Sequence, residues 1–219
     1  MELAQREAVG EKFSAAAMQR AQALTWEATE KIAAIIKPGM RESEAVAASK
    51  ALFGTLGMDR IWHPVLIRFG KNTVLTFSER SDDDPVLGDD DIYFIDIGVV
   101  FGAHEGDCGL TRTTGTDPDM QRCADDAKRL FGIVRDHWRT QGVSGQALYE
   151  FAQAQAKAMG WVLNLDMKGH RVSDFPHAIY KAGKLADLSD TPSGGLWILE
   201  IQIAHPTRAF GAFYEDLLV

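Results

Sequence analysis

The residues of this sequence that most clearly point to chemistry are carboxylates set inside apolar segments. A carboxylate buried among apolar neighbours is costly unless a cation or several hydrogen-bond donors compensate its charge. One such residue is more often explained by a turn or an arginine partner, so the argument depends on several of them sharing one core. Three of them are Asp96 within residues 93–98, Glu200 within residues 196–201, and Glu215 within residues 213–217.

A fourth carboxylate, Asp107, follows Asp96 by 11 residues in the segment Gly106-Asp107-Cys108-Gly109. A hairpin that turns near Gly102 would bring both carboxylates to one site on neighbouring strands. Mutual repulsion would raise the pKa values of three or four acids buried in one core, or cations must compensate them. Two divalent ions bridged by carboxylates, as in two-metal hydrolases, satisfy all of these charges together.

Two histidines follow at a spacing that suits the same site. His170, preceded by Gly169, offers an imidazole ligand for one ion, and His177 lies seven residues on, within reach from a loop. A single histidine in a chain of this composition is more often a surface or core residue than a ligand. The pair gains significance from the carboxylates around it.

The elements that must position these groups occur twice along the chain. Periodicity and punctuation by proline and glycine predict two helices followed by two strands, and then the same order again. The predicted helices cover residues 13–37, 42–56, 120–140 and 146–159, and the predicted strands cover residues 65–67, 92–100, 161–165 and 196–203.

Equal intervals support an internal duplication. Gly39 to Gly57 spans 18 residues, and so does Gly142 to Gly160, each interval holding a short second helix. We predict one α+β domain over residues 1–219, with similar halves of approximately 13–115 and 116–219. The alternative is a coincidence between two ordinary helical hairpins.

Composition narrows the classes of protein. A net charge of −8 argues against a nucleic acid or an anionic membrane as partner. The polar N-terminal segment is not a signal peptide, and no apolar stretch approaches the roughly 18 residues that span a bilayer, so we expect a cytoplasmic protein. Cys108 and Cys123 could pair, but in a chain of this size reduced thiols are expected.

The order of these residues resembles the methionine aminopeptidase and Xaa-Pro aminopeptidase family, the M24 metallopeptidases, whose pita-bread fold is itself a duplication. The resemblance covers nearly the whole chain, from residue 13 to residue 219. It is carried by Ile95-Asp96-Ile97-Gly98, Gly106-Asp107, Gly169-His170, His177, Leu199-Glu200-Ile201 and Phe213-Tyr214-Glu215-Asp216.

The resemblance implies a curved antiparallel sheet surrounded by duplicated helix-helix-strand-strand halves, and it implies a role for each residue. Asp96 would chelate one ion, while Asp107 and Glu215 would bridge two. His170 and Glu200 would complete the other ion, and Glu200 would also accept a proton from the bridging water. His177 would hydrogen bond the scissile carbonyl.

The implied cofactors are two divalent ions, with Mn(II), Fe(II), Co(II) and Zn(II) all suited to this ligand set. The implied partner is a peptide or a small amide substrate. The assembly state, with a homodimer as one candidate, is not decided by the sequence.

One departure from the family concerns a histidine that precedes the first metal-ligand strand and contacts substrate. Here the segment reads Asn72-Thr73-Val74-Leu75-Thr76-Phe77-Ser78, with Thr76 or Ser78 at the matching place. His63, His104 or His205 could take its place in space, and no spacing argument selects one of them. Substrate contacts are therefore expected from His177 and from a residue among Thr76, Ser78 and His63, and activity on ordinary peptides is in question.

Three functions are consistent with the sequence. The leading prediction is a dinuclear hydrolase that cleaves an amide bond at or near a peptide N-terminus. A specialised amide hydrolase of the creatinase type is the enzymatic alternative, favoured by the missing histidine. A binding module that holds a peptide or partner on the same fold is the third, although a non-catalytic relative has no reason to keep the full ligand set.

Overall fold

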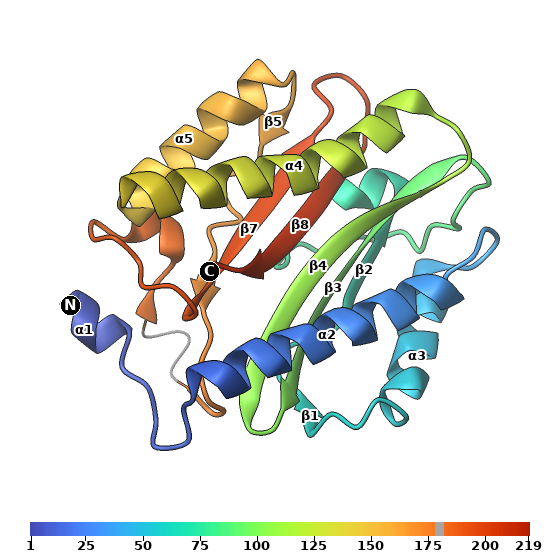
Figure 1. Ribbon diagram of the computed structural model, residues 1–219. Helices are drawn as coiled ribbons and strands as arrows, with labels where there is room; N and C mark the ends of the chain where they lie inside the picture. Colours follow the sequence, from blue (N-terminus) through green and yellow to red (C-terminus); the bar gives the residue numbers. More distant parts are fainter. Residues whose placement is uncertain (178–181) are drawn as a thin grey trace.

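One antiparallel sheet organises the molecule. The computed structural model describes residues 1–177 and 182–219 of the chain. The strands follow the order β1-β3-β4-β8-β7-β5, with β2 also paired to β3 and β6 also paired to β7. The hairpins β3–β4 and β7–β8 therefore meet at the centre, where β4 pairs with β8 (Figure 1).

The helices and strands lie close to the predicted positions. The helices are α1 (Leu3–Arg6), α2 (Ala15–Ile35), α3 (Glu42–Phe53), α4 (Pro118–Gln141) and α5 (Gly145–Ala158), with 3-10 turns at Gly70–Val74 and Leu185–Asp187. The strands are β1 (Arg60–Ile61), β2 (Leu66–Phe69), β3 (Asp91–Phe101), β4 (His104–Thr114), β5 (Val162–Leu163), β6 (His170–Arg171), β7 (Trp197–Ala204) and β8 (Gly211–Leu217).

Helix α3 and strand β5 are each shorter than predicted, for a local reason. Helix α3 stops at Phe53 rather than at residue 56, because the Thr55 and Leu56 N–H groups bond carbonyls three residues back. Strand β5 is shorter than residues 161–165, because the Asn164 side chain accepts a hydrogen bond from the Asp166 N–H and turns the chain.

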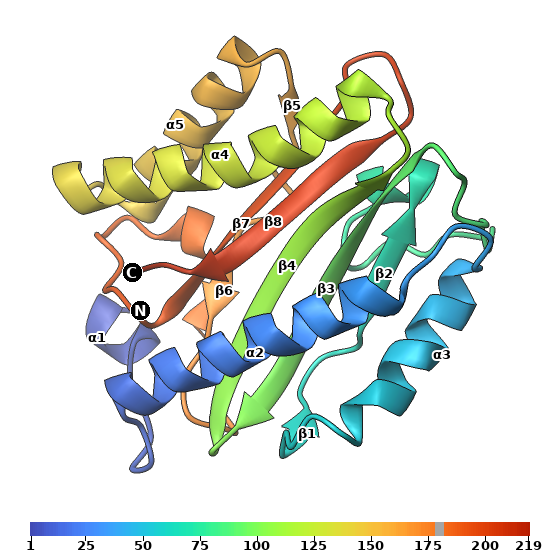
Figure 2. The ribbon, with the colours of Figure 1, turned by 45° about the vertical axis from the view of Figure 1, so that its right-hand side comes forward.

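Side chains alternate along the strands, so one face of the sheet packs against the helices and the opposite face carries the acidic residues. Ile95, Ile97 and Val99 of β3 pack with α2, whereas Asp96 between them points the opposite way. Leu199 and Ile201 of β7 pack in the same manner with α4 and α5. Figures 1 and 2 show α2 and α4 crossing the same face of the sheet. The mixed α and antiparallel β class is therefore as predicted.

The predicted hairpin between the first two carboxylates is confirmed. Phe101 of β3 pairs with His104 of β4, and Gly102 and Ala103 form the turn with φ values of 55° and 61°. Positive φ at both central residues is the geometry of the tight turns that suit the twist of antiparallel strands. The turn sets a register in which Asp96 faces Gly109 and Asp107 faces Gly98.

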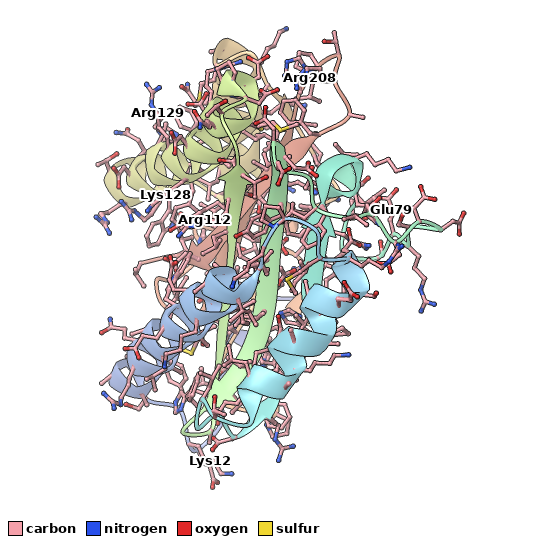
Figure 3. The ribbon with its side chains drawn as sticks, turned by 90° about the vertical axis from the view of Figure 1, so that its right-hand side faces the viewer. Lys12, Glu79, Arg112, Lys128, Arg129 and Arg208 are labelled. Carbon is pink, nitrogen blue, oxygen red and sulfur yellow. The ribbon has the colours of Figure 1, made fainter. Side chains whose placement is uncertain are left out.

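The outward sides of the helices are charged, as Lys128 and Arg129 on α4 illustrate (Figure 3). In residues 1–177 and 182–219, no helix combines the length and apolar character needed to cross a membrane. Cys108 and Cys123 are both free and buried.

We expect Gly106→Ala to lower the free energy of unfolding by about 1–3 kcal/mol. A Cβ at Gly106 would collide with Thr25 Oγ1 and lie 2.9 Å from the Ala21 carbonyl oxygen, so α2 could not pack as closely on β4. Urea unfolding followed by circular dichroism measures the effect. The matched control is Gly132→Ala in α4, where a Cβ meets nothing within 4 Å and should stabilise the helix by roughly 0.5–1 kcal/mol. Equal stability of the two variants would contradict this account of the packing.

Candidate metal centre and active site

Carboxylates from four strands form one row on the face of the sheet opposite the helices. Strand pairing places Asp96 of β3 beside Gly109 of β4, Gly109 beside Glu215 of β8, and Glu215 beside Glu200 of β7. Asp107 lies two residues before Gly109, so its side chain points to the same face. All four carboxylate residues are buried, with relative exposures between 1% and 7%. The structure therefore brings together the four acids that the sequence singled out.

The backbone under two of these acids is held by a side chain from the helix layer. Gln22 of α2 accepts a hydrogen bond from the Asp107 N–H at 3.0 Å and donates one to the Asp107 carbonyl at 2.5 Å. In the other half, the Tyr149 hydroxyl donates to the Glu200 carbonyl at 3.1 Å and accepts from the Glu200 N–H at 3.3 Å. In both cases the hydrogen bonds hold the backbone of the acidic residue and leave its carboxylate available for other contacts.

Gly109 keeps the middle of the row open. A Cβ at this position would lie 2.7 Å from Phe213 Cδ1 and 3.2 Å from Glu215 Cγ. A side chain there would collide with the Phe213 ring and crowd the Glu215 side chain. The glycine therefore lets Asp96 and Glu215 approach the same space from either side of β4.

His170 reaches the row from β6. Its Nε2 atom lies 2.9 Å from Asp107 Oδ2 and 4.0 Å from Glu200 Oε1, and its Nδ1 atom lies 3.1 Å from the Arg171 carbonyl oxygen. The preceding Gly169 has a φ of 66° and donates its N–H to Glu200 Oε2 at 2.6 Å. The predicted ligand set of Asp96, Asp107, His170, Glu200 and Glu215 thus converges on one site.

Of the three histidines that could replace the missing family residue, His63 is the one that enters the site. Its Nε2 atom lies 3.0 Å from Asp107 Oδ1 and 3.5 Å from Asp96 Oδ1. His104 instead accepts a hydrogen bond from the Ser14 N–H, and His205 lies between Trp161 and Phe210. Sequence spacing could not make this choice, because His63 reaches the carboxylates from a loop 33 residues before Asp96.

Thr76 and Ser78 interact with each other and with their own loop. Their hydroxyl oxygens are 3.4 Å apart, and the Thr76 N–H donates to Glu79 Oε2 at 2.7 Å. Phe77 between them packs edge-on against the His63 ring at 5.6 Å between centroids. Their predicted contact with substrate stays a prediction.

His177 lies beside the carboxylate row, next to a residue that the sequence analysis missed. Its Nδ1 atom contacts the carboxylate of Glu105, a side chain that is 1% exposed. Glu105 precedes Asp107 by two residues and so shares its face of β4. The alternation of the strand was the signal that could have identified it.

Neighbouring groups shift the pKa values within this cluster in different directions. Burial raises the pKa of Asp96 to about 7 and the pKa of Glu215 well above its usual value, the latter helped by the charges of Asp107 and Asp96. Burial also acts against ionisation of Asp107, but His63 and His170 outweigh it and lower its pKa to about 2. Burial opposes protonation of His63, and the charges of Asp107 and Asp96 overcome it and raise that pKa to about 10.

The donor atoms fit divalent cations. Among the described residues, neither Asp96 Oδ1 nor Glu215 Oε1 receives a hydrogen bond, although both atoms are buried. Donor atoms of His63, Asp96 and Asp107 lie within 4.8 Å of one another, and so do those of Asp107, His170 and Glu215. Asp107 belongs to both groups, so the residues present could hold two ions that share this carboxylate.

Known structures share this arrangement of helices and sheet. The fold is similar to the X-Pro aminopeptidase of Thermotoga maritima MSB8, with a TM-score of 0.74 and 16% identity over 97% of this chain and 59% of that one. It is similar to the prolidase of Pyrococcus horikoshii OT3, with a TM-score of 0.74 and 16% identity over 97% of this chain and 60% of that one. The methionine aminopeptidase of Thermotoga maritima matches with a TM-score of 0.71 and 12% identity, over 95% of this chain and 92% of that one.

These similarities define the fold as the predicted pita-bread fold. The chain spans about three fifths of the length of the X-Pro aminopeptidase and the prolidase, and nearly all of the methionine aminopeptidase. No curated protein shows significant sequence similarity to the chain. The model of metallopeptidase family M24, however, matches residues 16–219. With its fold, its carboxylate row and this match in agreement, the chain belongs to metallopeptidase family M24.

Proposed function

We propose that this chain is a dinuclear metal-dependent hydrolase that cleaves an amide bond at or near the N-terminus of a peptide. The observation that carries the proposal is the central position of Asp107. Its Oδ1 atom faces His63 Nε2, its Oδ2 atom faces His170 Nε2, and the residue belongs to two groups of candidate ligands. Membership of the metallopeptidase family and the aminopeptidase and prolidase folds support the same reaction class.

The proposed ligands follow the resemblance residue by residue. Asp96 would hold one ion, His170 and Glu200 would hold the other, and Asp107 and Glu215 would bind both. Two bound ions would lower the pKa of the water between them and stabilise negative charge on the substrate carbonyl oxygen. Mn(II), Fe(II), Co(II) and Zn(II) all accept this mixture of carboxylate oxygen and imidazole nitrogen.

Glu200 would accept the proton of the attacking water. One of its oxygens, Oε2, is fixed by the Gly169 N–H at 2.6 Å, while Oε1 points toward His170 at 4.0 Å. The hydrogen bond orients the carboxylate, and the hydrogen bond from Tyr149 to its backbone fixes the strand beneath it. A carboxylate positioned in this way can transfer the proton to the leaving amine.

His177 would donate a hydrogen bond to the substrate carbonyl. Its Nδ1 atom contacts the Glu105 carboxylate, and its buried Nε2 atom makes no hydrogen bond with the described residues. Glu105 itself is fixed through a hydrogen bond from the Ser173 N–H at 3.2 Å. His63, Thr76 and Ser78 remain candidates for further substrate contacts.

A largely apolar, open hollow beside β5 and β7 is our candidate for receiving the side chain of a substrate residue. It has a volume of about 310 Å³ and is lined by Val74, Val162, Leu163, Asn164, Leu165, Gln202 and Ala204. Gln202 follows Glu200 by two residues on β7, so both side chains face the same side of the sheet.

A cytoplasmic location and a homodimer remain predictions.

We expect Mn(II) or Co(II), at one fixed concentration of roughly 100 times the dissociation constant near pH 8, to raise the melting temperature by about 5–10 °C at that pH and by less near pH 6. The folded-state pKa values of Asp96, Glu215 and His63 are raised, so the protein without added metal holds protons that the unfolded chain releases. Their contribution to stability therefore falls as pH rises through the neutral range. Ions bind the deprotonated groups, so their stabilising effect grows in the same range. Differential scanning calorimetry with and without metal tests this, and an increment that does not change with pH would contradict it.

We expect Glu200→Gln to lower kcat by about 10²–10⁴-fold, because the amide cannot accept the proton from water. Hydrolysis of peptides that begin with Met, Ala or Pro, and of small non-peptide amides, measures the effect with Mn(II) or Co(II) present. The control is Glu30→Gln, an exposed residue of α2 paired with Arg112 at 2.6 Å, which should leave kcat unchanged. Turnover of only the small amides would favour the creatinase-type alternative, and metal binding without any turnover would favour the binding module.

We expect His177→Ala to lower kcat/KM by about 10²–10³-fold, the range for losing one donor to a developing oxyanion, while metal content stays unchanged. Elemental analysis and steady-state kinetics on the same preparation separate the two effects. His137→Ala provides the control, since His137 stacks on Phe151 at 3.8 Å between centroids in the α4–α5 pair. Loss of metal from His177→Ala, or unchanged kinetics, would show that His177 does not contact substrate.

A further inference from the structure

His63 occupies a position at the first group of carboxylates that matches the position of His170 at the second. His63 Nε2 lies 3.0 Å from Asp107 Oδ1, and His170 Nε2 lies 2.9 Å from Asp107 Oδ2. The two imidazoles therefore face opposite oxygens of one bridging carboxylate. Their side chains are similarly enclosed, with exposures of 12% and 13%.

The hydrogen bond on the far side of each ring fixes its orientation. His63 Nδ1 lies 2.9 Å from the Pro64 carbonyl oxygen, and His170 Nδ1 lies 3.1 Å from the Arg171 carbonyl oxygen. A carbonyl oxygen only accepts, so in both rings Nδ1 carries a hydrogen. Nε2 donates to the carboxylates while the ring is protonated, and it offers its lone pair to an ion once that proton has left. Metal-binding histidines commonly donate their other ring nitrogen to a backbone carbonyl in this way.

The sheet leaves room for the His63 ring by omitting a side chain. Gly98 follows Asp96 by two residues, on the same face of β3, and pairs with Asp107. A Cβ at Gly98 would collide with His63 Cδ2 and Nε2 and lie 2.7 Å from Trp62 Cε2. The ring can reach the carboxylates only because this position is glycine.

The loop that carries His63 is fastened to the two strands of the site. The Trp62 N–H donates to the Gly98 carbonyl at 3.0 Å, and the Trp62 indole Nε1–H donates to the Gly106 carbonyl at 3.0 Å. The Trp62 ring also contacts both histidine rings, at centroid distances of 4.6 Å from His63 and 5.7 Å from His170. His63 is therefore held in place rather than projecting from a free loop.

We propose that His63 is a protein ligand of the ion held by Asp96 and Asp107, so that each of the two ions receives one imidazole. The inference rests on the dinuclear site of the proposed function and adds a ligand to it. Two donor atoms each about 2.1 Å from one ion lie roughly 3–4 Å apart. His63 Nε2 meets this requirement at 3.0 Å from Asp107 Oδ1 and 3.5 Å from Asp96 Oδ1.

The competing role for His63 is a hydrogen-bond donor to substrate. In that role Nε2 would carry a hydrogen and would contribute nothing to the affinity for metal. Removal of the ring would then change KM or kcat and leave both ions in place. Metal binding measured in the absence of substrate therefore separates the two roles.

The experiment titrates protein freed of metal with Co(II), following heat by isothermal calorimetry and ligand field by visible absorption. We expect the wild-type chain to bind two ions. In His63→Ala and His63→Gln we expect one ion to bind at least about tenfold more weakly, with an altered absorption spectrum, while the other is unchanged. Added imidazole should restore the weakened site in His63→Ala. The control is His137→Ala, which should bind both ions as the wild type does.

Gly98→Ala supplies an independent test, because it keeps the imidazole and blocks its place. We expect this variant to show the same selective loss of one ion, provided that circular dichroism shows it folded. Two ions bound with wild-type affinity by folded His63→Ala and His63→Gln would overturn the proposal and favour the substrate contact. A wild-type chain that binds no ion would overturn the dinuclear site itself, and the role of His63 with it.

Discussion

The rest of the site depends on the electrostatic cost of setting carboxylates side by side in a sheet. The lateral row from Asp96 through Gly109 and Glu215 to Glu200 crosses four strands with no basic residue in it. Two unit charges 4 Å apart interact by roughly 4 kcal/mol at an effective dielectric constant of 20, and burial adds to that cost. Protons or cations must therefore enter the cluster. The imidazoles of His63 and His170 lie at the two oxygens of Asp107, and they can compensate only part of the negative charge of the four carboxylates.

The opposite face of the same strands supplies the stability that such a cluster needs. Every second residue over 93–101 of β3 and over 197–203 of β7 is hydrophobic and belongs to the core on the helix side, as Ile95, Ile97, Leu199 and Ile201 do. From the helix layer, Gln22 hydrogen bonds to the backbone of Asp107, and Tyr149 hydrogen bonds to the backbone of Glu200. The helices thus fix the strands at the positions from which Asp107 and Glu200 project on the other side.

Sequence alone was sufficient for the features that follow from local pattern. Apolar runs interrupted by acids predicted the strands and the hairpin between Asp96 and Asp107, because alternation and turn geometry are local properties. It was not sufficient for His63, whose ring meets the carboxylates only after β2 pairs with β3 and Gly98 leaves space. Glu105 was missed although its alternation with Asp107 was visible, because nothing in the sequence showed that His177 would contact it.

The two histidines also bear on the relation between the halves of the molecule. His63 lies just before β2, the strand that flanks β3, and His170 begins β6, the strand that flanks β7. Each ring turns Nδ1 to a carbonyl of the residue that follows it and Nε2 to Asp107. The strand register shows, however, that the two residues do not hold equivalent positions. His170 pairs with Ile198, two residues before Glu200, whereas Arg68 is the residue that pairs with Phe94, two residues before Asp96. The ligand role proposed for His63 therefore does not follow from the predicted duplication. It depends on the contacts of this ring with Asp96 and Asp107.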